Sequence, residues 1–368
     1  MPLKVISCLL FLLAPLGVVA QVINTTTMDT VETTIIGHVG LGGYVDTYYG
    51  YNFSQPASRK SPYFVSSSSH NELTVNLAYV DVRYRGTYMR VRFVPGFGTY
   101  MDANYAKEPG SLRNMLEANV GILVIPGKKI WIDAGVLGSP YTNESAISKD
   151  HLMYTRSFAP EYVPYYISGV KATIPLNAKL NAYLYLINGW QVIQDNNDGK
   201  SFGTQLEYRP NNNMLFNWNT YFGDERSSTN PDFRMRYFTD LYWIYNPGKK
   251  WSATSSFYAG IQEMDGASSA TWWQANLIGK YAFTEQFSLS ARLEYFHDAK
   301  GIIAVPITGA TGFRTASYGV CANFKLHKLA VFRIEARQFT SQENVYVNKD
   351  GNSANNSALL ISSLTAWF

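Results

Sequence analysis

The chain has 368 residues, and its composition already excludes several classes of protein. Basic residues (31) nearly balance acidic ones (27), giving a formal net charge of +4, and their scatter along the chain argues against a nucleic-acid partner. Aromatic residues make up 15% and charged residues only 16%, whereas a soluble domain has roughly 25% charged residues. The balance favours either a large secreted β-sandwich or an outer-membrane β-barrel.

The first 20 residues have the pattern of a secretory signal peptide, with Lys4 before an apolar stretch and Val18-Val19-Ala20 as the cleavage site. We expect cleavage before Gln21, a flexible periplasmic leader over 21–34 and a single domain over 35–368. No later apolar run reaches the about 18 residues of a membrane-spanning helix. Cys321 is the one cysteine left after cleavage, which excludes an intramolecular disulfide.

From Ile35 onward the hydrophobic pattern has a period of two, the signal of β-strands. Around position 290, for example, Phe287 and Leu289 alternate with Ser288 and Ser290. The sixteen predicted strands are 35–53, 71–84, 87–97, 114–125, 130–137, 165–174, 179–188, 201–209, 214–222, 234–245, 251–261, 271–283, 286–297, 313–325, 329–339 and 357–368.

The connections between these strands alternate between short and long. The short ones, at 85–86, 126–129, 175–178, 210–213, 246–250, 284–285 and 326–328, are rich in turn residues. The long ones are 54–70, 98–113, 138–164, 189–200, 223–233, 262–270, 298–312 and 340–356. A sandwich has no reason to keep this asymmetry, whereas a membrane barrel has short periplasmic turns and long outer loops.

The pattern therefore predicts an all-β fold, a transmembrane antiparallel β-barrel of about sixteen strands, with fourteen or eighteen left open by the 35–53 and 313–325 boundaries. Sixteen strands enclose a water-filled lumen. Aromatic residues near the short turns predict an interfacial belt: Tyr84, Tyr208, Tyr245, Trp251, Tyr281, Phe283, Phe287, Phe324 and Phe332. The terminal Phe368, with alternating apolar residues before it, resembles the recognition signal for the barrel-assembly machinery.

Two segments carry a family resemblance. The first strand contains GYVDTYYGYN at 43–52, followed by Pro56, and the third long loop contains YTRSF at 154–158, followed by Pro160 and Gly169. These patterns resemble the OmpL-like porin-2 family of outer-membrane β-barrels, and the resemblance spans most of the mature chain. It implies an outer-membrane channel, and it supplies no catalytic or ligand residue.

The strand parity predicts which charged residues line the lumen. Apolar positions such as Val80, Val82 and Met89 would face lipid, where a Lys or Arg at the midplane costs about 2–4 kcal/mol. The predicted pore-lining residues are Asp81, Arg83, Arg90, Arg92, Arg234, Arg236, Asp240, Arg292, Glu294, Arg333, Glu335 and Arg337. They either form Arg–carboxylate pairs that stiffen the wall, or provide a basic wall that filters solutes by charge.

The third loop, 138–164, is the longest and is the expected constriction, by analogy with general porins. Its acids Glu144, Asp150 and Glu161 would face the basic wall, and its prolines Pro160 and Pro164 indicate an ordered segment.

These features predict a passive porin for small hydrophilic solutes or ions in a bacterial outer membrane, in contact with its lipids. A homotrimer is possible by analogy with general porins. No cofactor or metal site is predicted, and without an HExxH, GxSxG or CxxC motif we expect no enzyme. The alternatives are a substrate-specific channel, for example for an oligosaccharide stacking on Tyr183 and Tyr185, and an adhesin or receptor with a blocked lumen.

Overall fold

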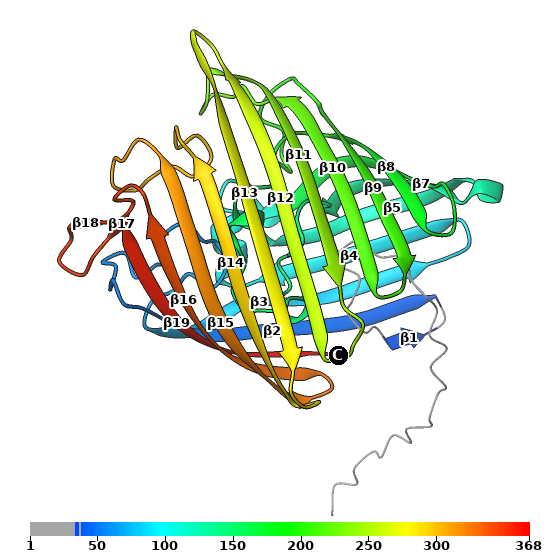
Figure 1. The fold of residues 1–368 in the computed structure, drawn as a ribbon. Helices are drawn as coiled ribbons and strands as arrows, with labels where there is room; N and C mark the ends of the chain where they lie inside the picture. Colours follow the sequence, from blue (N-terminus) through cyan, green and yellow to red (C-terminus); the bar gives the residue numbers. More distant parts are fainter. Residues whose placement is uncertain (1–33, 37) are drawn as a thin grey trace, which may run out of the picture.

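The computed structural model describes residues 34–36 and 38–368, which form one closed antiparallel sheet (Figure 1). Sixteen strands make the barrel wall: β2 (Val39–Asn52), β3 (Glu72–Arg85), β4 (Met89–Phe97), β5 (Met115–Ile125), β6 (Ile130–Gly138), β7 (Tyr166–Pro175), β8 (Leu180–Ile187), β9 (Ser201–Asn211), β10 (Met214–Asp224), β11 (Phe233–Tyr245), β12 (Trp251–Met264), β13 (Ala267–Ala282), β14 (Phe287–Asp298), β15 (Phe313–His327), β16 (Ala330–Ser341) and β19 (Asn356–Trp367). The predicted all-β barrel and its strand number are confirmed, and the sandwich is excluded.

Each strand pairs with its neighbours in the chain, and the last strand closes the barrel on the first. In the closing pair β19–β2, Leu359 lies opposite Asn52 and Trp367 opposite Tyr44. The backbone of Phe368 extends this ladder, because its N–H and C=O each bond to Gly43 at 3.0 Å. A side chain at Gly43 would overlap the Phe368 ring, so the glycine keeps room for the terminal aromatic at the seam.

The alternation of side chains follows the predicted parity. On β14, Leu289 and Leu293 are exposed on the outer surface (41% and 65%), whereas Ser290 and Arg292 are buried inside (1% each). Large apolar side chains are exposed in this way on nearly every strand, which is costly in water and favourable in hydrocarbon. The apolar face of each strand therefore points away from the barrel interior.

The connections largely keep the predicted asymmetry, with two differences. Residues 262–270 do not form a long loop, because β12 and β13 continue to a two-residue turn at Asp265-Gly266, and this hairpin rises above its neighbours (Figure 1). The Asp-Gly pair is the usual sequence of such a turn, and Gly266 has a φ of +63°. The expected strand 35–53 is divided into β1 (Thr34–Ile36) and β2, which pair through Ile36 and Val39.

The remaining long connections are L1 (53–71), L2 (98–114), L3 (139–165), L4 (188–200), L5 (225–232), L7 (299–312) and L8 (342–355). They carry the short helices α1 (Thr99–Asn104), η1 (Gly110–Asn114), η3 (Ser148–Asp150) and α2 (Phe158–Glu161) and the hairpin β17–β18 (Tyr346–Val347, Ser353–Ala354), while η2 (Pro126–Lys128) is a short turn. Among the described residues, no helix has the length and apolarity needed to cross a membrane. The predicted signal peptide and residues 21–33 of the predicted leader lie outside the described residues.

A continuous row of aromatic rings follows the turn end of β12 to β16. Trp251 contacts Tyr281 (4.6 Å between centroids), and the row continues through Phe283 and Phe287 to Phe324. These residues belong to the predicted belt, and rows of aromatic rings at the turn ends of strands are typical of the interfacial girdle of a membrane barrel.

If the outer face of the barrel contacts lipid, introducing a charge at two equally exposed apolar residues should change the stability of the protein to different extents. Leu293 (65% exposed) lies at the middle of β14, and Val305 (68% exposed) lies in L7. We expect Leu293→Arg to destabilise the protein in lipid vesicles by about 2–4 kcal/mol, and Val305→Arg to change little. Urea unfolding of the vesicle-inserted variants measures both. Equal losses would contradict a lipid-facing β14.

Candidate pore constriction

L3 leaves the wall at Gly138 and folds into the barrel, where most of its residues are buried. Tyr154 and Phe158 are at most 1% exposed, although they belong to a loop. Their contacts are made with strands on the far side of the barrel: Phe158 packs on Phe296 of β14 and Phe339 of β16. L3 therefore crosses the lumen from β6 to the β14–β16 wall.

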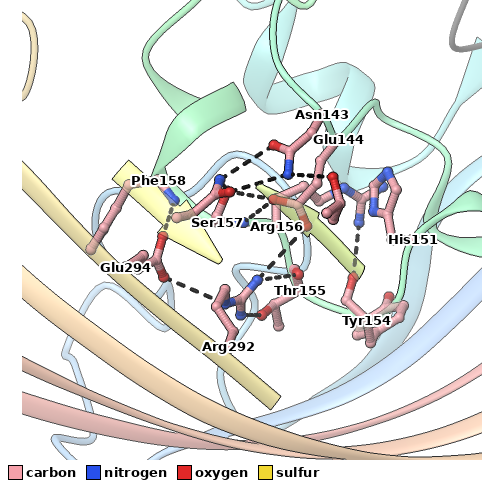
Figure 2. Close-up of polar contacts among 12 residues, drawn as sticks. Asn143, Glu144, His151, Tyr154, Thr155, Arg156, Ser157, Phe158, Arg292 and Glu294 are labelled. Atoms are coloured by element: carbon pink, nitrogen blue, oxygen red, sulfur yellow. Dashed lines mark hydrogen bonds and ion pairs between the residues drawn. The ribbon is translucent and has the colours of Figure 1, made fainter. Parts of the chain in front are cut away.

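Five charged side chains join L3 to that wall, and we call them the clamp: Glu144 of L3, Arg292 and Glu294 of β14, and Glu335 and Arg337 of β16 (Figure 2 shows the first three). Arg292 lies at the centre, with its guanidinium 2.8 Å from Glu335, 3.5 Å from Glu294 and 3.9 Å from Glu144. Arg337 pairs with Glu294. Because every member is buried, each charge depends on its partners rather than on water.

The clamp also binds the backbone of L3. One Glu335 oxygen accepts bonds from the N–H groups of Tyr154 and Thr155, both at 2.9 Å. Glu294 accepts a bond from the Phe158 N–H at 2.6 Å, and Glu144 accepts one from the Ser157 N–H at 2.8 Å. These contacts satisfy backbone donors that a buried loop would otherwise leave unpaired.

The wall arginines complete this bonding by donating to L3 carbonyl groups. Arg292 donates to the Thr155 oxygen at 2.8 Å, and Arg337 donates to the Arg156 oxygen at 2.7 Å. Residues 154–158 are therefore held from both sides of the peptide chain.

Arg156 holds L3 to itself rather than to the wall. Its guanidinium donates to the carbonyl oxygens of Ser145 (3.1 Å), Ala146 and Tyr154 (3.4 Å), and the side chain is 1% exposed (Figure 2). It thus ties the inward arm of the loop to the returning arm. The YTRSF motif combines this internal tie with the segment that the clamp binds.

Further anchors spread along the loop. Asp240 of β11 accepts a bond from the Thr142 N–H at 2.7 Å, and Arg333 of β16 donates to the Ser148 oxygen at 2.7 Å. His151 accepts a bond from the Ser145 N–H at Nε2 (2.9 Å), and burial lowers the pKa of this L3 imidazole well below its usual value, so the ring is neutral.

L1 packs on the same loop. Glu161 of α2 accepts bonds from the Val65 N–H of L1 (2.8 Å) and the Tyr165 hydroxyl (2.9 Å). Burial raises the pKa of this loop carboxyl to about 7, because an ionised carboxylate is poorly solvated there. The three L3 acids thus have different partners, since Asp150 pairs with Lys149 at 3.2 Å and only Glu144 reaches the wall arginines.

The predicted pore-lining residues lie on the interior of the strands, but they fall into different environments. Those covered by loops, rather than facing open water as expected, are Arg236, Asp240, Arg292, Glu294, Arg333, Glu335 and Arg337. Arg236 lies 4.9 Å from the Trp190 ring of L4, and Arg234 lies at the rim, paired with Asp265. Of the L3 acids expected to face the basic wall, Glu144 faces the wall arginines within one buried network, whereas Asp150 and Glu161 have other partners.

The other predicted residues belong to a cavity on the β3–β8 side. Arg83, Arg90 and Arg92 line this space of about 380 Å³, and Asp81 lies behind them, fully buried. Sequence reasoning missed Asp133 and Lys171, which pair with each other at 3.7 Å, and Glu117, which pairs with Arg92 at 2.7 Å. Their inward parity on β5, β6 and β7 was the signal that could have found them.

Comparison with known proteins agrees with this architecture. The family model of the OmpL-like beta-barrel porin-2 family matches residues 38–368. No curated protein matches the chain. Solved structures similar in fold, each 10% identical, are Salmonella typhi OmpF in complex with daunomycin (TM-score 0.61, covering 90% of this chain and 97% of that one), an anion-selective porin from Comamonas acidovorans (0.59, 90% and 99%) and Vibrio cholerae OmpT (0.57, 92% and 100%). With a closed sixteen-strand barrel and a family match over nearly its whole length, the chain belongs to the OmpL-like porin-2 family of outer-membrane β-barrel porins.

Proposed function

We propose that this porin passes small hydrophilic solutes by passive diffusion through the part of the lumen that L3 leaves open. The observation that supports this proposal is the space that remains beside the anchored L3. The loop is bound to β11, β14 and β16, and its residues 146–148 also contact β2 and β3, yet a cavity of about 380 Å³ remains against β3 to β8. L3 thereby sets the size limit, and transport needs no chemical step, cofactor or energy source.

The clamp acts in this proposal as a positioning device. Its two arginines and three glutamates are paired within 4 Å and buried, so it presents little charge to a passing solute. It keeps a loop of polar backbone at a fixed place in the lumen, where a mobile loop would close the path intermittently.

A substrate-specific channel is the second candidate. Tyr183 and Tyr185 point inward from β8, and Tyr183 lines the cavity, where its ring could stack on a sugar. Tyr185 is 4% exposed and its hydroxyl donates to Gln205 at 2.6 Å, which leaves it unsuited to a stacking track. Tyr183 is also only 5% exposed, so β8 offers no open pair of rings for stacking, and this favours general diffusion.

The proposed partners follow from the outer surface. Membrane lipids cover the apolar face of the strands, and the exposed ring of Phe368 at the seam is available to the barrel-assembly machinery. One structurally similar protein, Vibrio cholerae OmpT, has a trimer form, and we propose a homotrimer for this chain by the same analogy.

Breaking the clamp should loosen L3. We expect Glu335→Ala to give a larger and noisier single-channel current. The substitution removes the acceptor of two L3 amides and one carboxylate partner of Arg292. Breaking a buried ion pair in this way lowers the free energy of unfolding by about 3–5 kcal/mol. Planar-bilayer recording measures the conductance and the current noise of the variant. Asp265→Ala is the control, because it removes an exposed partner of Arg234. Identical noise and conductance in both variants would refute the role of the clamp.

Removing the loop tests the constriction itself. Replacing 145–160 by a short Gly-Ser linker should raise the single-channel conductance several-fold, because this segment fills the lumen beside β14 and β16. The matched control shortens L5 at 226–231, a segment at the outer rim, and should leave conductance unchanged. If the L3 variant conducts like the unmodified protein, L3 is not the constriction.

The terminal aromatic should matter for assembly rather than for stability. Phe368 and Phe283 have equal exposure (58% and 57%), so Phe368→Ala and Phe283→Ala remove similar apolar surface. We expect only Phe368→Ala to lower the amount of folded protein in outer membranes several-fold, measured by heat-shifted mobility on gels. In lipid vesicles without assembly factors, both variants should refold to the same yield. Equal levels in cells would exclude recognition of Phe368.

A further inference from the structure

The cavity on the β3–β8 side contains an excess of positive charge. It is bounded by short turns, at Gly86, Lys129 and Pro175, and reaches Ser139 at the base of L3, so it opens at the periplasmic mouth and ends at the constriction. Six cationic side chains line it: Arg83, Arg85, Arg90, Arg92, Lys129 and Lys171.

Three carboxylates pair with cations of this set: Glu117 and Asp133 line the cavity beside them, and Asp81 lies behind Arg83 and Arg92. Asp81 is shared by Arg83 (2.6 Å) and Arg92 (2.8 Å), and Asp133 is shared by Arg90 (2.5 Å) and Lys171 (3.7 Å). Glu117 pairs with Arg92 at 2.7 Å.

Exposure decides which sign a solute meets. The side chains of Asp81, Glu117 and Asp133 are 0%, 6% and 3% exposed, whereas those of Arg92, Lys171 and Arg90 are 14%, 16% and 34% exposed; Arg83, at 4%, is as buried as the acids. Of these paired groups, Arg90, Arg92 and Lys171 therefore present more surface to water than the acids do.

The strand register adds an independent argument. Arg83 lies directly opposite Arg92, and Arg85 lies directly opposite Arg90, in the β3–β4 pair. Like charges in such positions destabilise a sheet. Trp131 of β6 supports one of them, with the Arg90 guanidinium 4.5 Å from its ring centroid. A chain that had only to keep its lumen wet could have used neutral polar residues here, as it does along β12 and β13.

We propose that this cavity is a binding site for small multivalent oxyanions, that is, solutes carrying several carboxylate or phosphate groups, and that it makes the channel prefer anions. Arginine forks bind such groups by paired, charge-assisted hydrogen bonds. A site at the end of the constriction holds the anion on the diffusion path, and the charges attract further anions from the periplasmic side. The inference rests on the proposed diffusion function and names its substrate class.

The test uses the full mature chain, refolded in planar bilayers, at low ionic strength. We expect a reversal potential under a KCl gradient that shows chloride to be preferred over potassium, and block by citrate and by pyrophosphate but not by sucrose. The triple variant Arg90→Gln/Asp133→Asn/Lys171→Gln removes two cations together with the carboxylate they share, so no buried charge is left alone. It should weaken both the chloride preference and the citrate block at least about tenfold.

The control is Lys249→Gln/Lys250→Gln, which removes two exposed lysines from the β11–β12 turn, at the same mouth but outside the cavity. It should leave block and selectivity unchanged. An open channel that prefers potassium, or is not blocked by either anion, overturns the inference and leaves the porin function intact.

A barrel without conductance overturns the proposed function instead, and calorimetric titration of the detergent-folded protein with citrate then decides the inference. Binding that the triple variant weakens at least about tenfold supports the site, and no binding overturns it. A triple variant that fails to refold is replaced by Arg90→Lys, which keeps the charge and loses the fork. Its citrate block should be several-fold weaker, and unchanged block overturns the role of Arg90.

Discussion

Hydrocarbon offers no hydrogen-bond partner to a backbone, and the rest of this structure depends on that constraint. Every strand must pair on both edges, which forces β19 to return to β2. Once the sheet is closed, each strand can present only its apolar face to the lipid. If β14 were turned over, Arg292 would lie in lipid, where Leu293 lies now. The charges of the interior are therefore a consequence of closure, and their arrangement inside is what distinguishes this barrel.

Two arrangements of similar residues serve different purposes inside the barrel. In the clamp, Arg292 and Arg337 are surrounded by three glutamates and by loop backbone, and they are closed off from water. Against β3 to β8, six cations and two of their partner acids line an open cavity, and only Asp81 lies behind them. Burial, rather than residue type, separates an arginine that holds a loop from one that can meet a solute.

The period of two predicted the barrel, its strand number and the inward side of Arg83 or Glu335, since parity is a local property of each strand. It could not predict which inward residues the loops cover. That depends on the path of L3, and the path is set by contacts between positions far apart in the chain, such as Phe158 N–H with Glu294. The hairpin at Asp265-Gly266 was missed for another reason: the rule of alternating long loops outweighed a clear two-residue turn signal.

The charged side chains of the wall explain why L3 can be both buried and polar. A loop of this length inside a protein normally leaves amides and carbonyls unpaired. Here the wall supplies carboxylates to the amides of 154–158 and guanidinium groups to their carbonyls, while Arg156 pairs the carbonyls that face away from the wall. The charges that closure turns inward thus become the partners of a loop that has no strand to pair with, and a narrowed lumen is the result.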